Sequence, residues 1–173
     1  MTSTPARQSD RLYHELLAPE ETQSVRAAVR RIAEQEVAPH AAAIANGDER
    51  TDGFPRQVFD ALASAGVFRI PFPGEVGGDG LTHPATATAA AIEELAYYSS
   101  SVAAVFDVHC ILAGNALRQG TEEQRQRWLP RMAAGEIRGA LCLSEPDAGS
   151  DPGAMRTRAT RTEHGWRIDG TKA

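Results

Sequence analysis

The chain has few of the residues that would place it in a special structural class. Two cysteines among 173 residues cannot form a disulfide framework, and neither lies in a Cys-x-x-Cys pair. We therefore expect a reducing compartment, the cytoplasm. No apolar run approaches the length of a membrane span, and residues Met1–Asp10 lack the apolar core of a secretory signal. The sequence accordingly predicts neither a membrane protein nor a secreted one.

Positive charge is also scarce. The sequence has 18 lysine and arginine residues against 23 aspartate and glutamate residues, a formal net charge of -5. Proteins that bind nucleic acid or an anionic membrane surface usually carry an excess of positive charge, so we expect neither partner. The hydrophobic fraction of 42% and the charged fraction of 24% are typical of a soluble globular protein.

Common catalytic motifs are missing as well. The five histidines show no His-Glu-x-x-His pattern and no clustering with cysteine, so we predict no metal site. We interpret His109, in an apolar helical stretch, as a core residue whose hydrogen bonds are satisfied. Glu93 and Glu94 are consecutive on a helix, and we do not expect their carboxylates to converge on one point. Gly149-Ser150-Asp151 does not match the Gly-x-Ser-x-Gly motif of serine hydrolases.

Five stretches have the apolar periodicity of helices. We expect the first to follow Pro19 and to end at Pro39, since a residue before proline avoids helical angles. The others begin near Phe54, Thr82, Ser101 and Thr121. The fourth, to about Gln119, is apolar nearly all round, as buried helices are. Thr121–Gln124 has the sequence of a capping box, and the glycine-rich loop at residues 74–80 lacks the ending of a phosphate loop.

The periodicity changes near residue 139. Ala140–Ser144 is short and apolar and fits a strand. Thr157–Thr162 and Trp166–Asp169 are predicted to form strands around a turn at Glu163–Gly165. The sequence therefore predicts an α-helical bundle over residues 1–138 and an incomplete β segment over residues 139–173, because two or three strands alone are only marginally stable.

The stretch Leu141–Asp151 is the remaining candidate for chemistry. It is a strand end that runs into a tight loop, with unpaired backbone amides, small residues and two hydroxyl groups. Such a segment suits a planar polar heterocycle and a pyrophosphate. A plain connecting turn would have the same composition, and the residues alone favour that simpler interpretation.

This stretch, Ser144-Glu145-Pro146-Asp147-Ala148-Gly149-Ser150-Asp151, resembles the signature of the acyl-CoA dehydrogenase family, Thr/Ser-Glu-Pro-x-Ala-Gly-Ser-Asp. Other motifs of that family occur in the same order along nearly the whole chain. They are Ile70-Pro71, Gly77-Gly78-Asp79-Gly80-Leu81, Glu93-Glu94-Leu95-Ala96, Gly120-Thr121-Glu122-Glu123-Gln124, Trp128-Leu129-Pro130, Gly135-Glu136, and Gly170 with Lys172.

The resemblance implies a helical N-terminal domain over residues 1–138 and the truncated start of a middle β-barrel over residues 139–173. It implies FAD as cofactor and acyl-CoA thioesters as substrates, which are oxidised to 2,3-enoyl-CoA in fatty acid or amino acid catabolism. The residues expected to bind the cofactor are Leu141, Leu143, Ser144, Gly149 and Ser150, with Leu141, Leu143 and Ser144 against the flavin and Ser150 at the pyrophosphate and the substrate. No catalytic residue is expected here, because the family's base belongs to its C-terminal domain.

The resemblance also leads to expectations about the rest of the enzyme, beyond this chain. Ala173 stands one residue before the family's Trp/Tyr/Phe-Ile-Thr motif, so we expect a fragment that is inactive alone. The complete enzyme is expected to be a homo-oligomer that passes electrons to an acceptor flavoprotein. Two alternatives remain open: a flavin oxidase or monooxygenase of the same fold, and a non-catalytic helical remnant that binds a partner.

Overall fold

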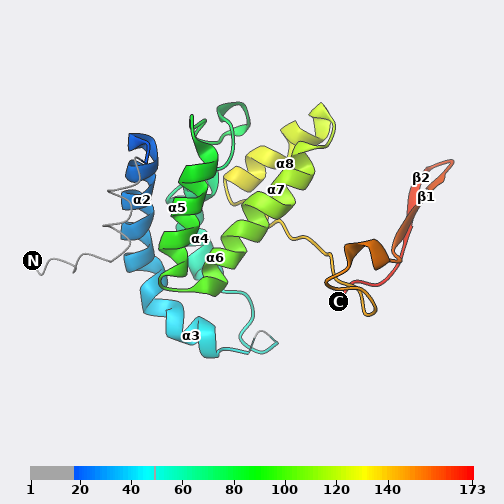
Figure 1. The fold of residues 1–173 in the computed structure, drawn as a ribbon, viewed down its shortest axis with the longest axis horizontal. Helices are drawn as coiled ribbons and strands as arrows, with labels where there is room; N and C mark the ends of the chain where they lie inside the picture. Colours follow the sequence, from blue (N-terminus) through cyan, green and yellow to red (C-terminus); the bar gives the residue numbers. More distant parts are fainter. Residues whose placement is uncertain (1–17, 49) are drawn as a thin grey trace, which may run out of the picture. The chain divides into compact units, whose positions relative to one another are not determined.

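The computed structural model describes residues 18–48 and 50–173 (Figure 1). The chain divides into two compact units, a helical one that ends at Gly139 and a smaller one that spans Ala140–Ala173. The segment Met1–Asp10, for which we expect no secretory signal, lies outside the described residues.

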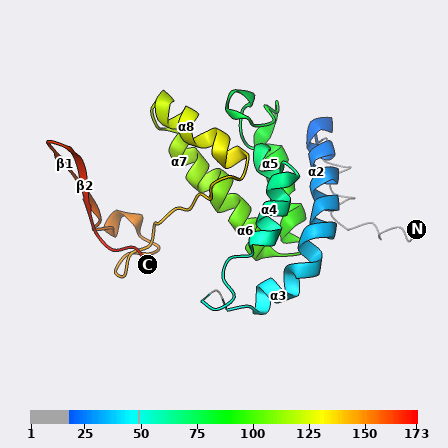
Figure 2. The ribbon, with the colours of Figure 1, turned by 180° about the vertical axis from the view of Figure 1, so that it is seen from behind.

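The first unit is a bundle of helices. Its α-helices are α2 (Glu20–Ile32), α3 (Ala41–Asn46), α4 (Arg56–Ser64), α5 (Pro84–Ala96), α6 (Ser100–Asp107), α7 (Gly114–Arg118) and α8 (Glu122–Ala133). Helix α5 packs against α2 on one side and α6 on the other, which both views of the ribbon show (Figures 1 and 2). The core that these helices enclose is rich in aromatic rings, and Phe59, Phe68, Phe72 and Phe106 are all buried in it.

The prediction that Pro39 ends the first helix is wrong. The chain stays helical through a π-helical turn, Ala33–Val37, and a 3-10 turn, Ala38–His40, and then continues as α3. Ala38, directly before the proline, has helical angles of φ -53° and ψ -43°. Pro39 occupies an early position of the new turn, where its missing N–H group costs no hydrogen bond. The change of helix type therefore carries the chain past the proline.

A continuous helix runs from Ser100 to Arg118, because a π-helical turn, Val108–Ala113, joins α6 to α7. One face, which includes Phe106 and Cys110, lies in the core, whereas Leu112 is exposed. Among the described residues this helix alone has the length and composition of a membrane span, with 19 residues and a mean hydropathy of 1.4. The prediction that no apolar run approaches this length is therefore wrong, although a core helix of a bundle has the same properties.

Two local predictions in this unit are confirmed. Thr121 and Gln124 form a capping box, in which each side chain bonds to the other residue's backbone N–H group, at 2.8 and 3.3 Å. The glycine-rich loop is structural: a Cβ atom added at Gly78 would lie 2.0 Å from the carbonyl oxygen of Phe72. Only glycine allows the loop to fold back so closely on Phe72.

The second unit contains a β-hairpin. Strands β1 (Arg158–Thr162) and β2 (Gly165–Asp169) pair in antiparallel fashion, with Arg158 opposite Asp169 and Thr162 opposite Gly165. The predicted hairpin is thus confirmed. The strand predicted at Ala140–Ser144 is wrong, since this segment is irregular in the structure. A strand needs a neighbour for its backbone ladder, and among the described residues the segment receives a single backbone hydrogen bond, from the Ala173 N–H group to the Ser144 carbonyl oxygen. The predicted fold class, a helical bundle followed by a partial sheet, holds.

Candidate functional site

The five residues predicted to bind a cofactor all lie in the unit Ala140–Ala173. Leu141 and Leu143 are 43% and 45% exposed, which is high for leucine. Ser144, Gly149 and Ser150 are exposed as well. Within the part of the chain that the structure describes, neither serine hydroxyl forms a hydrogen bond. The side chains of this segment are therefore accessible to a ligand.

A tight turn brings part of this set together. The backbones of Glu145 and Ala148 pair across the turn, with N···O distances of 2.8 and 3.1 Å. Ser144 directly precedes this pair and Gly149 directly follows it, so the two residues enter and leave the turn side by side. A Cβ atom added at Gly149 would have no neighbouring atom within 4 Å. A ligand can therefore approach the backbone closely at this point.

The backbone of the segment leading into the turn is polarised. Its last two carbonyl oxygens are occupied: Leu143 accepts from the Lys172 ammonium at 2.9 Å, and Ser144 accepts from the Ala173 N–H group at 3.0 Å. By contrast, the N–H groups of residues 141–144 donate to no atom of the described chain. At Leu143 and Ser144 the backbone thus presents free donors to a ligand, whereas both carbonyl oxygens are engaged.

Glu145 is the structural centre of this unit. Its side chain is only 6% exposed and accepts hydrogen bonds from the backbone N–H groups of Arg156 at 2.6 Å and Thr157 at 3.0 Å. The Lys172 ammonium lies 2.9 Å from the same carboxylate. The bond from Arg156, followed by those from Thr157 and Lys172, lowers the pKa of Glu145 to about 2. Glu145 is therefore a carboxylate at neutral pH.

Sequence reasoning assigned no role to Glu145 or Lys172, although both stand inside matched motifs. The two residues are 27 positions apart, and only the fold joins them. A charged residue at the end of an apolar run was an available signal, because a charge that becomes buried needs a partner.

A second charged cluster lies between α2 and α5. Glu94 is buried and pairs with Arg26 at 3.1 Å and with Arg30 at 2.9 Å, while Glu93 pairs with Arg26. The two adjacent carboxylates thus converge on Arg26, contrary to expectation, because the donors of one guanidinium are spread widely enough to reach both. The two arginines neutralise the two carboxylates, so the cluster does not resemble an acid–base site. It holds α2 against α5.

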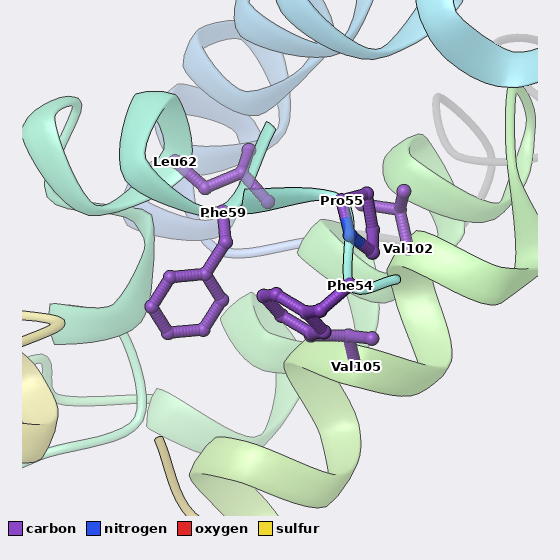
Figure 3. A pocket seen from close by; sticks show the side chains of 6 residues that line it. All are labelled: Phe54, Pro55, Phe59, Leu62, Val102 and Val105. Carbon is purple, nitrogen blue, oxygen red and sulfur yellow. The ribbon is translucent and has the colours of Figure 1, made fainter. Parts of the chain in front are cut away.

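The described residues of the helical unit offer little else that could carry chemistry. A small pocket between α4 and α6 is lined only by apolar side chains, those of Phe54, Pro55, Phe59, Leu62, Val102 and Val105 (Figure 3). Such a lining cannot orient a polar substrate. The residues that the structure describes contain no group of three or more histidine, cysteine, aspartate or glutamate side chains that could hold a metal ion.

Comparisons with known proteins agree on one family. Residues 19–136 match the family described as acyl-CoA dehydrogenase, N-terminal domain. The probable acyl-CoA dehydrogenase FadE25 of Mycobacterium tuberculosis is 37% identical over 154 residues, which are 89% of this chain and 38% of that protein.

Solved structures give the same result. The crystal structure of glutaryl-CoA dehydrogenase from Mycobacterium smegmatis matches with a TM-score of 0.81 and 33% identity, over 96% of this chain and 42% of that one. A structure of a glutaryl-CoA dehydrogenase from Mycobacterium smegmatis in complex with FADH2 matches with a TM-score of 0.77 and 29% identity, over 95% and 40% of the two chains. The chain thus spans about two fifths of the length of these relatives, and it belongs to the acyl-CoA dehydrogenase family.

Proposed function

We propose that this chain supplies the helical N-terminal domain and part of the flavin site of an FAD-dependent dehydrogenase that oxidises acyl-CoA thioesters to 2,3-enoyl-CoA. The family supports an oxidoreductase, and a relative solved with FADH2 supports the cofactor. The observation that carries the proposal is the segment Leu141–Ser144, whose backbone donors and hydroxyl group have no partner in the described chain.

The residues of this segment fit a flavin. The exposed leucines Leu141 and Leu143 offer apolar contact to a planar ring, and the free N–H groups with the Ser144 hydroxyl offer donors to its acceptor edge. We assign Ser150 to the pyrophosphate and to the acyl-CoA, and Gly149 to the close approach between backbone and cofactor. When bound, FAD would accept hydride from the β-carbon of the substrate, while donors such as Ser144 stabilise the negative charge that develops.

The wider setting is part of the same proposal. We assign removal of the α-proton to a base that this sequence does not contain, and we expect the isolated chain not to turn over substrate. We further propose a cytoplasmic homo-oligomer that passes electrons to an acceptor flavoprotein.

The test is a titration of the ¹⁵N-labelled chain with FAD, followed by the backbone amide shifts. We expect weak binding that shifts the amides of residues 141–150 and leaves those of α2 and α5 unchanged. ADP, which lacks the flavin, is the matched control and should shift the amide of Ser150 but not those of residues 141–144.

Two variants assign the hydroxyl groups in this titration. Ser144→Ala should weaken the response to FAD alone, whereas Ser150→Ala should weaken the responses to both ligands. Equal responses to FAD and ADP at residues 141–144, or no response there at the highest FAD concentration, would contradict the proposed function.

A further inference from the structure

Glu145 joins three separate parts of the second unit through one side chain. The carboxylate belongs to the turn after the proposed flavin segment, and it binds the backbone N–H groups of Arg156 and Thr157, just before β1. It also binds Lys172, which follows β2. Both carboxylate oxygens are used, since one accepts from Arg156 and the other accepts from Thr157 and Lys172.

Lys172 extends this connection to the segment itself. Its ammonium donates to the carboxylate of Glu145 and to the carbonyl oxygen of Leu143, each at 2.9 Å, and lies 3.3 Å from the Met155 sulfur. The next residue, Ala173, donates its N–H group to the carbonyl oxygen of Ser144. Residues 172 and 173 therefore occupy the last two acceptors of the segment.

A close backbone contact sets the course of the chain towards Lys172. A Cβ atom added at Gly170 would lie 2.2 Å from the Thr157 hydroxyl oxygen, and Gly170 has a φ of 157°. The chain after β2 thus passes directly against Thr157, the residue whose N–H group Glu145 accepts. Lys172 reaches Glu145 because glycine permits this approach.

We propose that Glu145 and Lys172 are positioning residues: Glu145 anchors Lys172, so that Lys172 binds the carbonyl group of Leu143 and Ala173 binds that of Ser144, which keeps these two acceptors away from the flavin. The inference rests on the proposed function, because it names the residues that shape the same site. Neither charged group is assigned contact with the cofactor or the substrate. An ammonium group suits this task, since its several donors can bind acceptors from two segments at once.

The pair should behave as a unit. Removal of the Lys172 ammonium leaves the buried carboxylate of Glu145 without its charged partner. Removal of the carboxylate charge likewise leaves the ammonium without a charged partner. We therefore expect Lys172→Met and Glu145→Gln to be non-additive, so that the double variant is no more disrupted than the worse single variant. Arg167→Met is the matched control, because Arg167 forms an exposed ion pair with Asp169 in the same unit.

The experiment measures amide hydrogen exchange and the FAD titration on the full chain and its variants. Protection of the Ala173 and Thr157 amides should fall about tenfold or more in Lys172→Met, as expected for loss of a hydrogen bond to a charged group. The FAD-dependent shifts at residues 141–144 should fall together with it. Both readouts should stay unchanged in Arg167→Met.

The outcomes separate the inference from the proposed function. If the wild-type chain responds to FAD and Lys172→Met loses both the protection and the response, the inference is supported. If Lys172→Met keeps the FAD response at residues 141–144, the positioning role is overturned and the proposed function stands. If the wild-type chain shows no response at these residues, the proposed function is overturned together with the inference, whatever the exchange rates are.

Discussion

His109 offers the sharpest test of how the helical unit is held together. Its ring is 1% exposed and lies edge-on to Phe59 and Phe68 in the aromatic core. Nδ1 accepts the N–H group of Gly139 at 2.9 Å, so the proton must be on Nε2, which donates to the carbonyl oxygen of Met132 at 3.0 Å. The expectation of a core histidine with satisfied hydrogen bonds is thus confirmed, and the ring fixes the last residue of the unit.

The substitution His109→Leu removes both hydrogen bonds but keeps most of the apolar volume. The carbonyl group of Met132 retains a bond from Gly135, whereas the N–H group of Gly139 loses its partner. An unsatisfied, partly buried donor costs about 1–3 kcal/mol, so we expect a loss of about 2 kcal/mol in the free energy of unfolding. His109→Asn, whose side-chain oxygen can replace Nδ1, should recover part of this loss.

Urea unfolding followed by circular dichroism measures the free energy, and hydrogen exchange measures protection of the Gly139 amide. This amide should be protected in the wild type and in His109→Asn but not in His109→Leu. His164→Leu, in the exposed hairpin turn, is the control and should change stability by less than about 0.5 kcal/mol. Unchanged stability and unchanged Gly139 protection in His109→Leu would refute the reasoning.

The same side chain predicts a dependence of stability on pH. Burial lowers the pKa of His109, and the bond to Met132 only partly opposes this effect. The unfolded chain therefore takes up this proton more readily than the folded one, so stability is full above about pH 6.5 and falls as the pH decreases below it. The loss comes from the uptake of this one proton on unfolding. It should be absent from His109→Leu, and an identical pH profile in both proteins would contradict the assignment.

Three further predictions concern separate sites. Gly78→Ala would place a Cβ atom 2.0 Å from the Phe72 carbonyl oxygen and should destabilise the helical unit by about 3 kcal/mol or more in urea unfolding, whereas Gly74→Ala, with no atom within 4 Å, should not. Thr121→Ala should cost about 1 kcal/mol by the same measurement, and Thr121→Ser should restore the cap. Backbone N–H groups and an ammonium lower the pKa of Glu145 to about 2. The contribution of Glu145 to the stability of the second unit should therefore be complete above about pH 4.5 and lost towards pH 2. An NMR titration of this carboxyl group with a midpoint at the ordinary value for glutamate would contradict this.

Helix starts and the hairpin were predictable because their signals lie within a few consecutive residues. The capping box of Thr121 and Gln124 needs only one turn of chain, and the two strands of the hairpin are joined by a short turn. Such signals act before any distant part of the chain has to be placed.

The predictions that were wrong concern features that a few consecutive residues do not determine. The rule that a proline ends a helix applies to a uniform α-helix. Around Pro39 the chain changes to π and 3-10 turns, and the local sequence does not predict this change. The segment Ala140–Ser144 has the composition of a strand, yet a strand exists only with a partner, and a partner is not a property of the segment itself. The prediction of a flavin site in the segment Leu141–Ser144 depended on the family's motifs, since its residues alone favoured a connecting turn.

Among the residues that the structure describes, the buried charged side chains all hold structure. Glu94 is neutralised by Arg26 and Arg30 between two helices, and Glu145 is held by Lys172 and by backbone donors. What the segment Leu141–Ser144 offers to a ligand is neutral: backbone N–H groups, a hydroxyl group and leucine side chains. This division suits the proposed function, in which a flavin would carry the reaction and the protein would contribute binding, orientation and fixed dipoles. Under the proposed function, substitutions at the buried charges should therefore alter the geometry of the flavin segment rather than remove a reacting group.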